Sequence, residues 1–79
     1  MNVYEKIEEI IVNKLGKQAS DFNENASLRK DLGLNSLELA QLAAMIEDEF
    51  DIVVDDVDIY QISTIKDTYD HICSALEEK

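Results

Sequence analysis

Apolar residues recur at helical spacing in three parts of the chain, and they predict three amphipathic helices. We expect these helices over about residues 3–15, over 36–50 and from Thr64 onward. The apolar stripes are Val3, Ile7, Ile10, Ile11 and Leu15; then Leu39, Leu42, Ala43, Ile46 and Phe50; and last Ile65, Tyr69, Ile72, Cys73 and Leu76. Because each stripe must be covered, the helices are predicted to pack together into an all-α bundle.

A long connection, residues 17–35, separates the first two helices. An unstructured loop of this length is uncommon in a compact domain, so it needs anchors. Three apolar residues can pin it to the core: Phe22, Leu28 and Leu32. Ser27 or Asp31 can cap a short turn within it.

The segment after residue 50 has a β-branched run, but a lone short strand has no partner to pair with. We therefore expect an extended loop in which Ile52 and Val54 are buried. Asp55 or Asp56 can then cap a short helix over about 57–61. With this addition the prediction is a four-helix bundle that has three longer helices, one short helix and a long first loop.

Composition agrees with this fold. The 79 residues suit one small domain, residues 1–79, and 46% of them are hydrophobic, enough for a core. The absence of proline and the presence of only two glycines favour helices over a turn-rich β fold.

No apolar run approaches the length of a membrane span, and the N-terminus has no signal-peptide core. We expect a monomeric cytoplasmic protein that does not insert into membranes.

Charge is distributed unevenly along the chain. The formal net charge is −11, and from Asp31 to Ile65 there are nine acids and no Lys or Arg. This sign excludes direct binding to nucleic acid, and it disfavours an anionic membrane surface. A solvated acidic face is one interpretation. Because the acids lie around the 36–50 helix, we favour a second interpretation, in which their negative electrostatic potential steers basic partner proteins toward this helix.

The acids do not form a predicted metal site. Asp55, Asp56 and Asp58 lie close together, but this loop lacks the glycine and the closing glutamate of an EF-hand. The sequence contains no other cluster with metal-ligand spacing, so we expect no dedicated metal.

The start of the 36–50 helix carries the candidate chemistry. Asn35 is a favoured N-cap, and Glu38 stands at the third helical position, where its carboxylate can bond back to the cap amide. Ser36 is then the first helical residue, and its hydroxyl lies at a helix N-terminus. Such a hydroxyl is well placed to carry a phosphate, because free amides and the helix dipole favour an anion there.

An enzymatic role for Ser36 lacks the groups that it needs. A nucleophilic serine requires a base, an orienting group and oxyanion donors. The chain has one histidine, His71, in the last helix, and it has no G-x-S-x-G elbow. We therefore expect that Ser36 is the acceptor of a group, and we expect that the protein is not an enzyme.

Three segments resemble the acyl carrier protein family in its order and spacing. Residues 31–38 (DLGLNSLE) resemble the family's prosthetic-group site, D-L-G-x-D-S-L-D/E. Residues 47–52 (EDEFDI) are similar to its E-E-E-F-D/G-I segment, and residues 62–67 (ISTIKD) to its I-x-T-V-x-D segment. The resemblance covers essentially the whole chain.

The resemblance implies a cofactor and a mechanism. A phosphopantetheinyl transferase would move 4′-phosphopantetheine from coenzyme A to Ser36, and the terminal thiol would carry acyl groups as thioesters. The cargo would pass between synthases, reductases and transferases of fatty-acid or related lipid or polyketide synthesis. These enzymes would have basic docking surfaces.

Two further sets of site residues are predicted. The first lies beside Ser36, largely on the face of the 36–50 helix opposite its core stripe, and would contact partners: Asn35, Leu37, Glu38, Ala40, Gln41, Ala44, Glu47 and Asp48. The second, which the resemblance implies, would line a shelter for the acyl chain between the helices: Leu39, Leu42, Ala43, Ile46, Ile62 and Tyr69.

Four residues depart from the family's pattern. Asn35 replaces the usual aspartate before the serine, Gln41 replaces an acid, and Ala40 and Ala44 replace larger apolar residues. A flatter and less charged partner face suggests a specialised carrier for one dedicated pathway. The residues leave two alternatives open: an aminoacyl or peptidyl carrier, and an acidic helical adaptor in which Ser36 stays unmodified.

Overall fold

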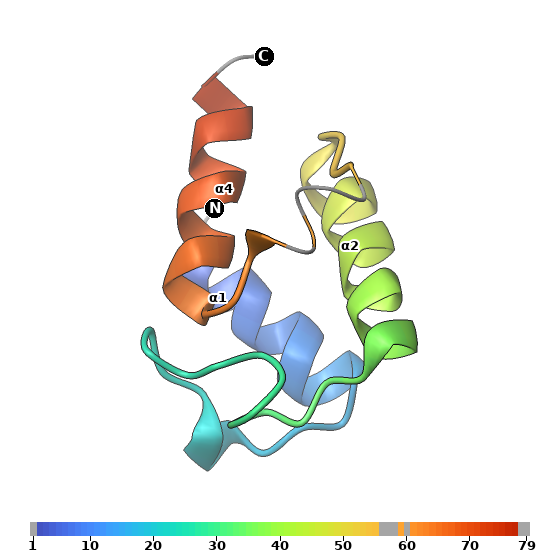
Figure 1. Ribbon diagram of the computed structural model, residues 1–79. Coiled ribbons are helices and arrows are strands. Elements are labelled where there is room, and N and C mark those ends of the chain that lie inside the picture. The colour runs from blue at the N-terminus through green and yellow to red at the C-terminus, as the bar shows by residue number, and fades with distance from the viewer. Residues whose placement is uncertain (1, 56–58, 60, 78–79) are drawn as a thin grey trace.

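The computed structural model describes residues 2–55, 59 and 61–77, and this part of the chain is helical (Figure 1). Its elements in chain order are α1 (Val3–Glu9), the π-helical segment η1 (Ile10–Lys14), the 3₁₀ turn η2 (Ala19–Asp21), α2 (Ser36–Phe50) and α4 (Ile65–Glu77). The described residues contain no strand beyond an isolated antiparallel bridge between Ser27 and Thr64. The all-α prediction is confirmed.

The predicted short helix over 57–61 lies largely outside the described residues, as does Asp56, one of its two predicted caps. Of this stretch the structure describes Ile59 and Gln61. Ile59 is buried, and its N–H donates to the carbonyl of Asp55 at 3.1 Å. Ile52 and Val54, each 8% exposed, are buried as predicted.

The first helix matches its predicted range, but its second half is wound differently. The Leu15 N–H donates to the Ile10 carbonyl at 3.0 Å, an i→i−5 bond typical of a π-helix. The sequence pattern did not predict this change, because apolar periodicity does not separate the two bonding schemes over one turn. Gly16 follows with φ of +71°, a conformation that favours glycine at a helix end.

The long connection is pinned as predicted, because its apolar side chains are buried. These are Phe22, Leu28 and Leu32, together with Ala26 and Leu34, which were not predicted. Both predicted caps also act within it. The Lys30 N–H donates to Ser27 Oγ at 3.2 Å, and the Ser27 N–H donates to Asp31 Oδ2 at 2.7 Å.

The connection also bonds to the start of α4. The Ile65 N–H donates to the Ala26 carbonyl at 3.1 Å, and the Lys66 N–H donates to the Glu24 carbonyl at 2.9 Å. In the other direction, the Leu28 N–H donates to the Ser63 carbonyl at 2.9 Å. Because first-turn amides of a helix have no partner within it, the loop supplies two of the acceptors that α4 needs.

The first turn of α4 carries the predicted cap. The Asp67 N–H donates to Thr64 Oγ1 at 3.1 Å. In return, Asp67 Oδ2 accepts from the Thr64 N–H at 3.2 Å, from the Ser63 hydroxyl at 2.9 Å and from the Ser63 N–H at 3.2 Å. The Ser63 hydroxyl, followed by these amides, lowers the pKa of the Asp67 carboxyl.

This cap predicts a specific acid response. A lowered folded-state pKa contributes stability above the carboxyl's ordinary value of 3.8, and the contribution is lost as the pH falls through the lowered value. Thermal unfolding between about pH 6 and pH 2 should therefore show a steeper acid loss for wild type than for Asp67→Ala. Asp70→Ala, at an exposed position on the same helix, is the control. Parallel curves for wild type and Asp67→Ala would contradict the prediction.

The core lies where three helices meet: α1 packs against α4, and η1 packs against α2 (Figure 1). Within α4 the buried stripe differs from its prediction. Tyr69, predicted to be buried, is 38% exposed, whereas Thr68 is fully buried. Thr68 can replace an apolar residue because its hydroxyl donates back to the Thr64 carbonyl at 3.0 Å. The Tyr69 ring instead packs edge-on against Tyr4 at the rim, with centroids 6.5 Å apart.

Candidate functional site

Ser36 is exposed at the first position of α2, where a reciprocal cap fixes the helix end. The Glu38 N–H donates to Asn35 Oδ1 at 2.8 Å, and the Asn35 N–H donates to Glu38 Oε1 at 3.1 Å. Both predicted halves of the capping box are therefore confirmed. The local sequence is sufficient for this geometry, because every partner lies within three residues.

The N-terminus of α2 has backbone N–H groups that are available to bind an anion. The Leu39 N–H donates to the Asn35 carbonyl at 2.9 Å, and the Glu38 N–H is used by the cap. Within the described residues, the amides of Ser36 and Leu37 have no acceptor. These two amides and the positive end of the helix dipole favour a phosphate on the Ser36 hydroxyl.

The loop before the helix holds Ser36 at the surface. Leu32 and Leu34, 5% and 3% exposed, are buried on either side of Gly33. Gly33 has φ of +69°, which an L side chain rarely adopts, and a Cβ there would meet no atom within 4 Å. The turn therefore needs glycine for its backbone conformation. The Leu34 N–H closes the loop on the Leu28 carbonyl at 2.9 Å.

Two acids of α2 are already paired with lysines from the first part of the chain. Glu38 Oε2 lies 2.9 Å from Lys17 Nζ, and Glu49 Oε1 lies 2.7 Å from Lys6 Nζ. The hydrogen bond from Lys17, followed by that from the Asn35 amide, lowers the pKa of Glu38. Glu38 is thus engaged on both carboxylate oxygens, so less of its charge is available to a partner than the sequence suggested.

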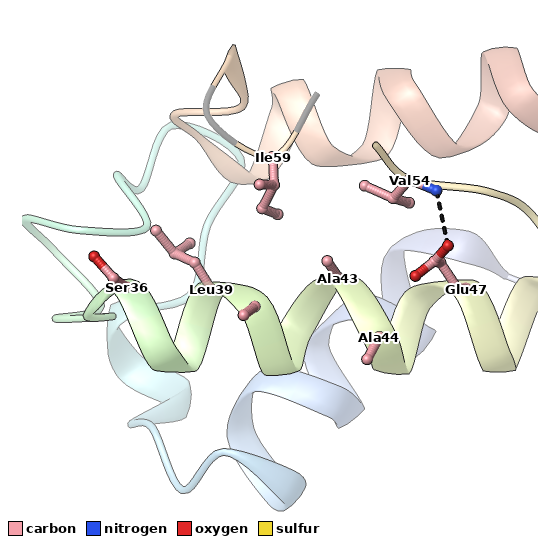
Figure 2. A pocket seen from close by; sticks show the side chains of 8 residues that line it. Ser36, Leu39, Ala43, Ala44, Glu47, Val54 and Ile59 are labelled. Atoms are coloured by element: carbon pink, nitrogen blue, oxygen red, sulfur yellow. Dashed lines mark hydrogen bonds between the residues drawn. The ribbon is translucent and has the colours of Figure 1, made fainter. Parts of the chain in front are cut away.

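A cavity of about 170 Å³ lies beside Ser36 along α2. It is lined by Ser36, Leu39, Ala40, Ala43, Ala44, Glu47, Val54 and Ile59. Figure 2 shows the side chains of Val54 and Ile59 pointing toward α2, with Ser36 near one end of the cavity and Glu47 near the other. The Val54 N–H donates to Glu47 Oε2 at 3.2 Å and fastens this wall to the helix (Figure 2).

The predicted acyl-chain lining is only partly gathered at this cavity. Leu39 and Ala43 line it, whereas Leu42 and Ile46 are fully buried in the core. Ile62 is half-buried and does not line it. Tyr69 lines a separate cavity of about 140 Å³ with Tyr4, Glu24 and Lys66.

Four apolar residues that line this cavity were absent from the predicted acyl-chain lining: Ala40, Ala44, Val54 and Ile59. The predicted burial of Val54 was the available signal for one of them. The other three depend on which edge of α2 the later segment covers, and helical periodicity does not give that information.

The predicted partner face lies mostly in solvent. Five of its residues are exposed along α2 and a sixth precedes the helix: Leu37, Ala40, Gln41, Ala44 and Asp48, with Asn35 before them. Leu37 is 68% exposed, which is high for a large apolar side chain. Glu38 and Glu47 are half-buried and hold the internal contacts described above.

Two other site classes find no support within the described residues. No group of three or more His, Cys, Asp or Glu side chains is arranged to hold a metal ion in this part of the chain. None of the described helices is long and apolar enough to cross a membrane.

Comparison with known proteins gives concordant matches. A family model described as a phosphopantetheine attachment site matches residues 5–72. An acyl carrier protein from Nitratidesulfovibrio vulgaris is 39% identical over 72 residues, 91% of this chain and 95% of that protein. One from Solidesulfovibrio magneticus is 40% identical over 72 residues, 91% of this chain and 92% of its own. The crystal structure of a Thermotoga maritima acyl carrier protein matches with a TM-score of 0.83 at 34% identity, covering 94% of this chain and 86% of that one.

Proposed function

This chain belongs to the acyl carrier protein family, and from that premise we propose that Ser36 is the residue that bears 4′-phosphopantetheine. Family membership makes the protein a carrier and not an enzyme, and it makes phosphopantetheine its prosthetic group. It also favours the carrier over the unmodified adaptor. The observation that supports Ser36 is its exposed hydroxyl at the capped N-terminus of α2, beside two unused amides and a cavity.

Loading consists of one group transfer. The Ser36 hydroxyl oxygen forms a bond to the phosphorus of coenzyme A that carries the pantetheine arm. The bond from that phosphorus to the bridging oxygen breaks, and adenosine 3′,5′-bisphosphate leaves. The hydroxyl proton passes to a base of the transferase, because no residue in the described part of the chain hydrogen-bonds to the Ser36 hydroxyl. The arm, once bound, supplies a thiol that holds acyl groups as thioesters.

Residues of this chain position that reaction. The cap formed by Asn35 and Glu38 keeps the helix end, and with it the Ser36 hydroxyl, in one place. The amides of Ser36 and Leu37 and the helix dipole favour the negative charge of the phosphodiester that results. An amide at position 35 caps as well as a carboxylate but adds no charge, so Asn35 leaves the site less anionic than the family's pattern.

The experiment is intact-mass measurement after incubation with coenzyme A and a broad-specificity phosphopantetheinyl transferase. We expect a gain of one phosphopantetheine, and fragmentation should place it on Ser36. If wild type gains nothing but Asn35→Asp is loaded, the protein depends on a dedicated transferase. A modification mapped to any other residue would contradict the proposal.

The cavity beside Ser36 is proposed to shelter part of the acyl chain, with Leu39 and Ala43 from α2 facing Val54 and Ile59. Six of its eight lining residues are apolar, and burial of a CH₂ group is worth about 0.8 kcal/mol. Methyl chemical shifts of Val54 and Ile59 should therefore change between forms loaded with short and long chains. Shifts that are the same in all acyl forms would rule out sheltering.

Family membership implies interaction with acyl synthases and transferases. We propose that they contact the exposed side of α2, at Leu37, Ala40, Gln41, Ala44 and Asp48. The small residues at 40 and 44 and the uncharged Gln41 support a carrier for one dedicated pathway. We also propose that this carrier works in the cytoplasm. The excess of acids supports partners with basic surfaces.

A further inference from the structure

Val53 is a large apolar side chain on the surface with no role in the site described above. It is 73% exposed, whereas its neighbours Ile52 and Val54 are each 8% exposed. Successive side chains of an extended segment point to opposite sides, so burial of the two neighbours turns Val53 outward.

The backbone on both sides of Val53 is fastened to one residue of α2. The Ile52 N–H donates to the Glu47 carbonyl at 3.3 Å, and the Val54 N–H donates to Glu47 Oε2 at 3.2 Å. Val53 is also β-branched and therefore stiff about χ1. A side chain presented this rigidly loses little conformational entropy when a partner covers it, which favours affinity.

The charges along this part of the chain indicate what kind of partner fits. Asp48, Asp51 and Asp55 are exposed around Val53 in the sequence, and no Lys or Arg occurs from Asp31 to Ile65. These closely spaced carboxylates would repel an anionic lipid surface or nucleic acid, so they disfavour binding to either one. The complementary surface is a protein with a small apolar pocket whose rim carries Lys or Arg.

We infer that Val53 is a second docking point for the transferase that loads Ser36, in addition to Leu37. This inference rests on the proposed function. Before loading, the protein has no arm for an enzyme to hold, so recognition depends on the protein surface alone. Leu37 adjoins Ser36, and Val53 follows the other end of α2, a helix of about 22 Å. One contact leaves the carrier free to turn about it, and a second contact restricts that rotation.

Loading kinetics test the inference with the unmodified protein at saturating coenzyme A and a broad-specificity phosphopantetheinyl transferase. Val53→Thr replaces one methyl group by a hydroxyl at nearly constant shape. We expect it to raise KM about three- to fivefold, in line with the loss of one buried methyl group, and to leave kcat unchanged because Ser36 is untouched. Val53→Ile, which stays apolar, should give a lower KM than Val53→Thr.

Ala19→Ser is the matched control, because it adds a hydroxyl at an exposed position in η2 and leaves α2 and the segment after it unchanged. Its KM should equal that of wild type. A KM for Val53→Thr within twofold of wild type would overturn the inference while loading of Ser36 remained intact. A dimer in size-exclusion chromatography that Val53→Thr abolishes would also overturn it, since a second copy would then occupy the surface. Failure of both wild type and Asn35→Asp to load would refute the proposed function itself.

Discussion

Ser36→Ala protein should gain no mass with coenzyme A and transferase under conditions in which wild type gains one phosphopantetheine. The effect is expected to be all or none, because the new phosphodiester bond needs the hydroxyl oxygen of Ser36. Intact-mass spectrometry measures it directly. Other serines in the chain, such as Ser63, are not at the N-terminus of α2 and should not substitute for Ser36.

The loss must be separated from unfolding, and the position makes that possible. Ser36 is exposed, and the cap is made by Asn35 and Glu38, so removal of its hydroxyl should change stability by no more than about 0.5 kcal/mol. Thermal unfolding of Ser36→Ala should therefore match wild type. A mutant that folds normally and still gains one phosphopantetheine would contradict the assignment of Ser36.

Ile72→Ala should remove most of the stability of the fold. Ile72 is fully buried in α4, which packs against α1, and its truncation leaves a cavity that the neighbours cannot fill completely. Such a change costs about 3 kcal/mol or more, in a domain whose total stability is of order 5 kcal/mol. At about 4–8 °C per kcal/mol for a chain of this size, Tm should fall by more than about 10 °C.

Two variants on the same helix calibrate this result. Ile72→Val keeps most of the side chain and should cost about 1 kcal/mol. Ser74→Ala, at an exposed position, should have almost no effect on Tm in the same calorimetric scan. If Ile72→Ala melted within a few degrees of wild type, the packing of α4 described above would be wrong.

The local structure around Ser36 was predicted correctly from sequence where it depends on near neighbours. The capping box of Asn35 and Glu38 and the limits of α2 follow from residues within one turn. The pinned connection also followed, because apolar residues in a polar loop have few alternatives to burial. In each case the sequence contained both partners of the interaction that decides the geometry.

The remainder depended on contacts that a linear pattern does not contain. Val54 and Ile59 form a wall of the cavity because both side chains lie over one edge of α2. Tyr69 is exposed while Thr68 is buried. Thr68 can be buried because its hydroxyl donates a hydrogen bond to the Thr64 carbonyl of the same helix. Helical periodicity places both residues near the stripe, but tertiary packing decides which one is covered.

The backbone bonds between the first connection and α4 have a consequence for how the chain folds. Leu28 with Ser63, and Ala26 with Ile65, pair segments that are far apart in the sequence. The first turn of α4 therefore gains its acceptors only after a long loop has closed, at an entropic cost that local helix formation does not repay. We therefore expect the connection and the first turn of α4 to order together, and more slowly than the local helices.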